Sequence, residues 1–160
     1  MTEKEKMLKE MLYDANNDED LLKERAIAKD LCFKFNQLMP SDTVNQKKIL
    51  HQLLGPIDDS TCIMSPFWCD YGYNIKIGRH FFANHNTVIL DGAEVTFGDN
   101  VWIGAGVQVM PGVTIGDNVV IGGGSVVVKD IPSNSVAVGN PCHVIREITD
   151  KDEQTNWNHN

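Results

Sequence analysis

Residues 97–131 read FGDNVWIGAGVQVMPGVTIGDNVVIGGGSVVVKDI, and an aliphatic or aromatic residue stands at every sixth position. These positions are Phe97, Ile103, Val109, Ile115, Ile121 and Val127, and glycine directly follows four of them. A strict six-residue period fits neither the 3.6-residue period of a helix nor a series of hairpins with longer spacing. It fits a parallel β-helix in which each unit supplies one inward side chain and the glycine and Gly-Asp-Asn segments turn the corners.

The period extends to a second set of positions and to residues upstream. Small or branched residues stand four places after each of the first set: Val101, Val107, Val113, Val119, Ser125 and Ile131. Upstream, the same period is kept two residues out of phase by Ile77, Ala83, Ile89 and Val95. Three units make one coil, so the sequence predicts three coils, over 77–94, 97–114 and 115–132.

The residues before the repeat predict helices. Met7, Leu8, Met11 and Leu12 form a short apolar stripe at helical spacing. Asn17 or Asp18 can cap a second helix. Its expected buried side is Leu21, Leu22, Ile27, Leu31 and Phe35. A third helix runs from Val44 to Leu54, with Ile49, Leu50 and Leu53 apolar, and ends at Gly55-Pro56. The chain therefore divides into a helical segment over 1–56, a β-helix over 57–148 and a polar tail over 149–160.

Composition excludes several classes of protein. The length of 160 residues suits one domain with a small appendage, and the net charge of −8 with no dense Lys/Arg run argues against nucleic-acid binding. No apolar run is long enough for a membrane span, and residues 1–18 do not resemble a signal peptide. Cys32, Cys62, Cys69 and Cys142 form no zinc pattern, so we expect reduced thiols, no metal and a cytoplasmic protein.

Longer phrases give a family resemblance. The stretches IGDNVVIGGGSVVVKDIP (115–132) and VGNPCHVIREI (138–148) resemble the hexapeptide-repeat acyltransferases, which fold as left-handed β-helices. The stretches MLYDANNDEDLLKERAIAKDLCFKFN (11–36) and DYGYNIKIGRHFFANHN (70–86) narrow the resemblance to the maltose and galactoside O-acetyltransferase group. This group moves an acetyl group from acetyl-CoA to a sugar hydroxyl and works as a homotrimer with its active site between subunits.

The resemblance implies roles for individual residues. It implies an acceptor-sugar pocket lined by Asp14, Arg25, Asp70 and Asn84. It implies a CoA path along Trp102, Ala105, Gly123, Val128, Lys129, His143 and Arg146. The chemistry fits, because cations suit the phosphates of CoA and carboxylates and amides suit sugar hydroxyls. Three consecutive glycines over 122–124 let a ligand lie close to the backbone.

Most of these residues also have a structural interpretation. The Lys129-Asp130 pair can be a solvated turn, and Asn84 can cap a corner of the coil. Arg25 can be an exposed helix charge, and Trp102 can pack on a face. Cys142 and His143 are adjacent in extended chain and should point to opposite sides, so they do not suit a nucleophile and its base.

One departure from the family bears on catalysis. The family's catalytic base is a histidine in a TA-x-HP phrase, which this chain lacks. In residues 97–104, FGDNVWIG, the start of one repeat (FGDN) is followed directly by residues that resemble the next coil (VWIG). One coil of the family, with its histidine and its loop, is therefore missing. Removing whole units from a repeat keeps the inward-facing positions of the remaining coils in register. The catalytic residue is therefore unknown from sequence. His85, the histidine nearest the acceptor residues, is a candidate base, although the sequence favours an exposed corner of the coil for it. Among the other histidines, neither His51, His80, His143 nor His159 stands in the expected phrase.

Three functions remain open from sequence. The first is an acetyl-CoA-dependent O-acetyltransferase acting on a sugar. The second is a catalytically impaired trimeric scaffold that still binds CoA, because loss of a general base costs about 10²–10⁴ in rate and loss of a coil shifts layers by about 4.8 Å. The third is a purely structural β-helix used for assembly.

Overall fold

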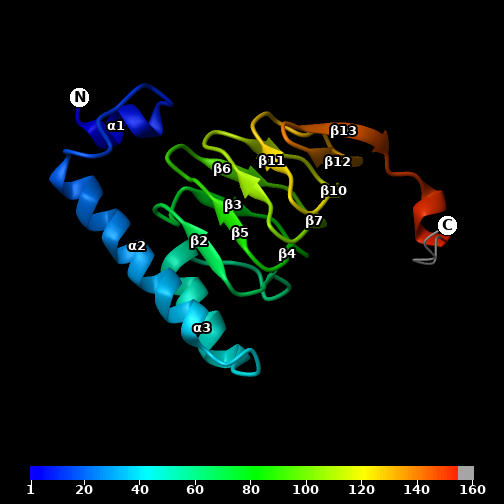
Figure 1. The fold of residues 1–160 in the computed structure, drawn as a ribbon, viewed down its shortest axis with the longest axis horizontal. Coiled ribbons are helices and arrows are strands. Elements are labelled where there is room, and N and C mark those ends of the chain that lie inside the picture. Colours follow the sequence, from blue (N-terminus) through cyan, green and yellow to red (C-terminus); the bar gives the residue numbers. More distant parts are fainter. Residues whose placement is uncertain (155–160) are drawn as a thin grey trace.

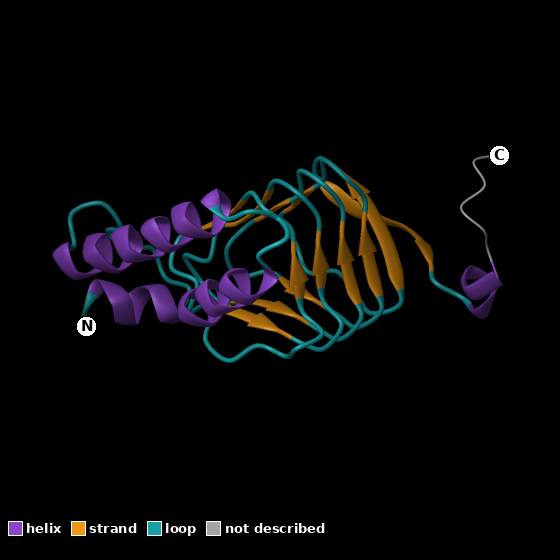
Figure 2. Cartoon of the chain, turned by 90° about the horizontal axis from the view of Figure 1, so that it is seen from below, coloured by secondary structure: helices purple, strands orange, loops and turns teal. Residues whose placement is uncertain are grey.

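The six-residue units fold into short parallel strands that wind around one core, in a computed structural model that describes residues 1–154 (Figures 1 and 2). The first coil holds β1 (Cys62–Ile63), β2 (Phe67–Cys69) and β3 (Ile75–Ile77). The second holds β4 (Phe82–Ala83), β5 (Thr87–Ile89) and β6 (Val95–Phe97). The third holds β7 (Val101–Ile103), β8 (Gln108–Val109) and β9 (Thr114–Ile115). The fourth holds β10 (Val119–Ile121) and β11 (Val126–Val127), and Ile131 bridges back to Ile115.

Three sheets form the faces of this left-handed β-helix. One sheet has the order β1-β4-β7-β10-β12-β13, the second β11-β8-β5-β2 and the third β3-β6-β9. All pairs are parallel except the last, in which β12 (Ser135–Gly139) meets β13 (Cys142–Glu147) antiparallel. The antiparallel β13 ends the stack at the C-terminal side (Figure 1).

The predicted inward positions form the core. Both sets of repeat positions in 97–131 are buried, with Ile103, Val109, Ile115, Ile121 and Val127 fully enclosed. The upstream change of phase has a structural cause. Ile89 and Val109 are paired residues of neighbouring coils. Val95 stands six residues after Ile89, whereas Val113 stands only four residues after Val109. The corner over 90–94 therefore carries two more residues than the corner over 110–112.

The expected number of three coils is wrong, because a fourth precedes them. Its inward residues Ile63, Cys69 and Ile75 also stand six apart and are buried. The stretch lacks the Gly-Asp-Asn corners that make the later repeats visible. The following coils stack directly where the sequence predicts a missing coil, since Phe82 pairs with Trp102 and Ala83 with Ile103.

The two Gly-Asp-Asn phrases, together with the Pro-Ser-Asn stretch over 132–134, build one corner of the helix. Asn100, Asn118 and Asn134 adopt positive φ of 56°, 52° and 59°, and their amides are linked in a ladder at 3.0 Å per step. The Asp117 carboxylate accepts the backbone N–H of Asp99 at 2.7 Å. A Cβ on Gly98 would lie 2.3 Å from that carboxylate oxygen, so only glycine fits here.

Three helices cover the first coil. They are α1 (Glu3–Leu8), α2 (Glu19–Gln37) and α3 (Thr43–Leu54). Asp18 caps α2, as predicted, and Gly55 ends α3 with φ 79°. The Sγ atoms of Cys32 in α2 and Cys69 in β2 lie 3.8 Å apart, so this helix packs closely on the coil. None of the helices in the described part of the chain is long and apolar enough to cross a membrane.

Two expected helix faces are partly wrong. In the first stripe only Met7 is buried, whereas Leu12 is fully exposed because α1 ends at Leu8. In α2 the buried face is Leu21, Ala28, Cys32 and Phe35. Leu22 and Ile27 are exposed, because small Ala28 and Cys32 allow the closer approach to β2. Leu31 is partly buried against the core.

The expected polar tail begins with a short helix. Asp150–Gln154 form a short 3₁₀ helix, η1, and Asp152 pairs with Arg146 at 2.8 Å. Residues 155–160, which include His159, lie outside the described residues.

Truncating a fully enclosed inward side chain should cost far more than truncating an outward one. We expect Ile103→Ala to lower the free energy of unfolding by about 2–5 kcal/mol, because it leaves a cavity between stacked coils. The outward Gln108→Ala should change it by less than about 0.5 kcal/mol. Urea unfolding followed by circular dichroism measures both, and equal losses would contradict this packing.

Candidate functional site

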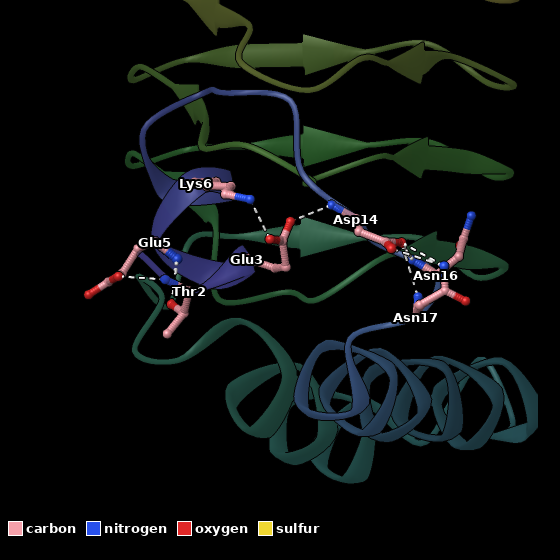
Figure 3. A network of polar contacts seen from close by, with 7 residues as sticks. All are labelled: Thr2, Glu3, Glu5, Lys6, Asp14, Asn16 and Asn17. Carbon is pink, nitrogen blue, oxygen red and sulfur yellow. Dashed lines mark hydrogen bonds and ion pairs between the residues drawn. The ribbon is translucent and has the colours of Figure 1, made fainter.

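The first group of expected acceptor residues lies where the chain enters α2. Asp14 follows half-buried Tyr13 in the loop between α1 and α2, and its carboxylate accepts from the amide of Asn17 at 2.9 Å and the backbone N–H of Asn16 at 3.1 Å (Figure 3). These hydrogen bonds, above all that of Asn17, lower the pKa of Asp14. Arg25 donates from Nη2 to the carbonyl of Ala15 at 2.8 Å. Arg25 therefore ties the loop to α2.

Asp70 joins this group at the corner that follows β2. Lys29 of α2 lies 3.4 Å from its carboxylate and also donates to the carbonyl of Cys69 at 3.1 Å. The helix that carries Arg25 is thus bonded to the corner that carries Asp70.

Asp91, which sequence reasoning missed, fixes the shape of that corner. Its fully buried carboxylate accepts the backbone N–H groups of Asp70, Tyr71 and Gly72 at 2.9, 2.9 and 2.7 Å. Burial raises the pKa of Asp91, and the three N–H bonds oppose this rise. An aspartate at the end of an apolar stretch in a repeat is the only sequence signal for it.

Asn84 and His85 lie at a different corner, between β4 and β5. Asp70 follows the end of β2 and Asn84 precedes the start of its neighbour β5, so the two lie at opposite ends of the same sheet. The Asn84 side-chain oxygen accepts the backbone N–H of His85 at 2.8 Å, which is the capping role that the sequence also allows. His85 is exposed, and its Nδ1 contacts the carbonyl of Ser65. A carbonyl only accepts, so Nδ1 carries the proton of the neutral ring and Nε2 keeps its lone pair.

Several expected CoA residues stack above His85. The carbonyl of His85 accepts from Gly106 at 2.9 Å, and the carbonyl of Ala105 accepts from Gly124 at 2.8 Å. The corners of His85, Ala105 and Gly123 therefore form one column. Ala105, Gly123 and Gly124 are exposed, and no atom lies within 4 Å of a Cβ placed on Gly124. The column leaves open backbone for a ligand chain.

Trp102 and Arg146 share one outward row of the largest sheet. Trp102 stacks on Phe82 with ring centroids 6.0 Å apart and pairs in register with Val120. Val120 pairs with Val136, which pairs with Arg146. Trp102 therefore packs on the outer face of this sheet, and Arg146 lies in the same row of that face.

The remaining expected CoA residues lie at the end of the stack. Val128 and Lys129 are exposed at the corner after β11, and the adjacent Asp130 caps the backbone N–H of Thr114 at 2.8 Å. In β13, Cys142 is buried and His143 is exposed, which confirms that they point to opposite sides. His143 Nδ1 lies 3.2 Å from the carbonyl of Pro141.

Within one chain, the expected site residues thus lie at separate places. Helix α2 is bonded to the loop of Asp14 through Arg25 and to the corner of Asp70 through Lys29, whereas Asn84 and His85 share the corner that begins the column leading to Gly123. Within residues 1–154, no group of three or more His, Cys, Asp or Glu side chains could hold a metal ion.

Comparisons with known proteins agree with this architecture. The model of the maltose acetyltransferase hexapeptide capping motif matches residues 6–58, and the bacterial transferase hexapeptide model, with six repeats, matches residues 94–129. The crystal structure of a maltose O-acetyltransferase from Clostridium difficile 630 is 42% identical in sequence and covers 94% of this chain and 99% of that chain, with a TM-score of 0.77. A galactoside acetyltransferase in complex with coenzyme A is 34% identical and covers 96% and 94%, with a TM-score of 0.75.

A Saccharomyces cerevisiae protein, provisionally named an acetyltransferase, is 45% identical over an alignment of 180 residues. The alignment covers 90% of this chain and 92% of the yeast protein. The aligned region is longer than the 160 residues of this chain, so the yeast protein carries positions that this chain lacks. This agrees with the loss of a segment that the sequence predicts.

Replacing Asp91 should damage the corner that carries Asp70. Asp91→Asn turns one acceptor oxygen into a donor that faces a backbone N–H, so we expect the free energy of unfolding to fall by about 1–3 kcal/mol. The exposed Asp59→Asn serves as a control and should change it by less than about 0.5 kcal/mol. Urea unfolding compares the two, and an unchanged Asp91→Asn protein would refute the role of Asp91.

Proposed function

Because the chain belongs to the hexapeptide-repeat acetyltransferases of the maltose and galactoside O-acetyltransferase type, we propose that it transfers an acetyl group from acetyl-CoA to a hydroxyl group of a sugar. The observation that carries this proposal is that α2 binds both the loop of Asp14 and the corner of Asp70. Its Arg25 donates to the carbonyl of Ala15, next to Asp14, and its Lys29 pairs with Asp70. Carboxylates of this kind accept hydrogen bonds from sugar hydroxyls and so orient an acceptor.

We propose that the acceptor pocket forms between neighbouring copies of a homotrimer. Asp70 and Asn84 lie at opposite ends of one sheet, so a single chain does not bring them to one sugar. A neighbouring copy can present its Asn84 corner to the Asp70 corner of the first. Closed symmetry of this type repeats the same contact three times.

The proposed donor path uses the open glycine corner and two cations. Acetyl-CoA would run along Ala105 and Gly123, where the exposed backbone permits close approach. Trp102 and Val128 would supply apolar contact. Lys129 and Arg146 would bind phosphate groups through charge-assisted hydrogen bonds, and His143 is exposed near the same end of the stack.

We assign the general base to His85. The missing phrase leaves no histidine at the family's position, and the Ser65 carbonyl holds the His85 ring with Nε2 as its acceptor atom. Nε2 would take the proton of the sugar hydroxyl while that oxygen attacks the thioester carbonyl. The carbon–sulfur bond then breaks, and the CoA thiolate takes a proton from the imidazolium.

A second candidate function follows from the direct stacking of β4 on β7. Without the missing coil the acceptor and donor layers are displaced by about 4.8 Å, and smaller errors already slow catalysis. The chain would then be a trimeric scaffold that binds CoA without acetyl transfer.

Mass spectrometry of the sugar separates these functions. The protein is incubated with acetyl-CoA and glucose, maltose or a galactoside, and we expect an acetylated sugar above background. The His85→Ala variant should lower kcat by about 10²–10⁴, because it removes the base. His51→Ala removes an exposed histidine of α3 and should leave kcat unchanged.

Two results would contradict the proposal. Acetyl transfer that His85→Ala leaves intact would remove the role of His85. A folded protein that forms no product but binds CoA in calorimetry, with weaker binding by Lys129→Ala, would establish the scaffold instead.

A further inference from the structure

A cavity of about 350 Å³ lies between the loop that follows α1 and two corners of the β-helix. The loop contributes Glu10, Met11 and Tyr13, and the corners contribute Gly92–Ala93 and Pro111–Gly112. These corners belong to neighbouring coils because Ile89 pairs with Val109. The direct stacking of these two coils therefore helps to create the cavity.

Glu10 occupies a backbone conformation that glycine normally takes. It follows the C-cap of α1, and its φ is 56°. A glutamate in the left-handed region is strained by about 1 kcal/mol or more. Among residues 1–154, its carboxylate has no hydrogen-bond or ion-pair partner that would compensate for this strain. Its end lies 3.9 Å from the position of a Cβ on Gly112, so the conformation holds the charge over the cavity.

Glu10 is the single charged residue among those that line the cavity in the described part of the chain. The neighbouring cations are engaged elsewhere. Lys6 pairs with Glu3, and Lys29 pairs with Asp70. Arg25 is bonded to the carbonyl of Ala15, and Lys9, which precedes Glu10, is exposed and does not line the cavity.

The other lining groups suit a sugar ring. Met11, Ala93 and Pro111 offer apolar surface to ring C–H groups. Tyr13 adds a phenol, whose oxygen lies 2.8 Å from the position of a Cβ on Gly92, so it reaches deep between loop and corner. Asp14 follows directly in sequence, which connects the cavity to the acceptor group.

We infer that this cavity binds the ammonium group of an amino-sugar acceptor through Glu10. The inference rests on the proposed function and names its acceptor class. Glu10 is exposed at the mouth of this open cavity, and its unpaired carboxylate there attracts a cation more strongly than a neutral hydroxyl. Glu10 acts in acceptor binding and takes no part in proton transfer.

The test measures binding directly, so it does not depend on turnover. Ligand-observed NMR titrations compare methyl glycosides of glucosamine, galactosamine and 6-amino-6-deoxyglucose with their neutral parent sugars at pH 7 and low salt. For the wild-type chain we expect at least one amine to bind about tenfold more tightly than its neutral partner. The preference should shrink as salt is added.

Two variants assign the preference to Glu10. Glu10→Gln keeps the side-chain length and should abolish the preference. Glu10→Gly should also abolish it but raise the midpoint of thermal unfolding, because glycine removes the strain at φ 56°. Lys9→Ala removes the adjacent charge that faces solvent and should keep the preference.

The outcomes separate this inference from the proposed function. If no amine binds better than its neutral partner, or if Glu10→Gln keeps the preference, the inference is wrong, whatever sugars are acetylated. If the preference appears and depends on Glu10 but no sugar is acetylated, the cavity stands and the proposed catalysis fails.

Discussion

The backbone register between successive coils is the constraint on which the molecule depends. Each coil donates and accepts hydrogen bonds with the coils on either side, as between Val88 and Val107 at 3.0 Å and between Gly104 and Ile121 at 2.9 Å. A slip of one residue would turn every inward side chain outward. Removing a whole coil does not cause such a slip, which is why Phe82 can meet Trp102 and the core remains closed. The ladder therefore tolerates the loss of a whole layer without a change of register.

The same register decides where functional residues can lie. Strand residues are either inward and buried or outward on a face, so open backbone is available at the corners. The column of His85, Ala105 and Gly123 exists because corners of successive coils stack. The helical cap adds a second set of side chains to a different corner through Lys29 and Asp70. Two distant sets on one chain become one site only if copies assemble.

Periodic features could be predicted from the sequence, and unique contacts could not. The inward residues from Phe97 to Ile131 follow from the six-residue period because each fills an equivalent place. The first coil could not be predicted because no Gly-Asp-Asn phrase marks the corners between Ile63, Cys69 and Ile75. The helical period places Leu22 and Ile27 on the buried face of α2, but packing on β2 selects the small Ala28 and Cys32. Individual contacts over long sequence separation, such as Asp91 with Gly72 or Glu10 over Gly112, leave no periodic pattern. The candidate site residues are indicated by the family resemblance and not by the six-residue period.

Subunit complementation tests most directly whether the two sets of residues form one site between copies. Asp70→Asn and His85→Ala proteins are prepared separately, mixed under conditions that exchange subunits, and assayed by mass spectrometry for acetylated sugar. Each variant alone should be nearly inactive. Mixed trimers should regain a substantial fraction of wild-type activity, because some interfaces pair an intact Asp70 corner with an intact His85 corner. No recovery after verified exchange, with wild-type protein active, would contradict a site shared between copies.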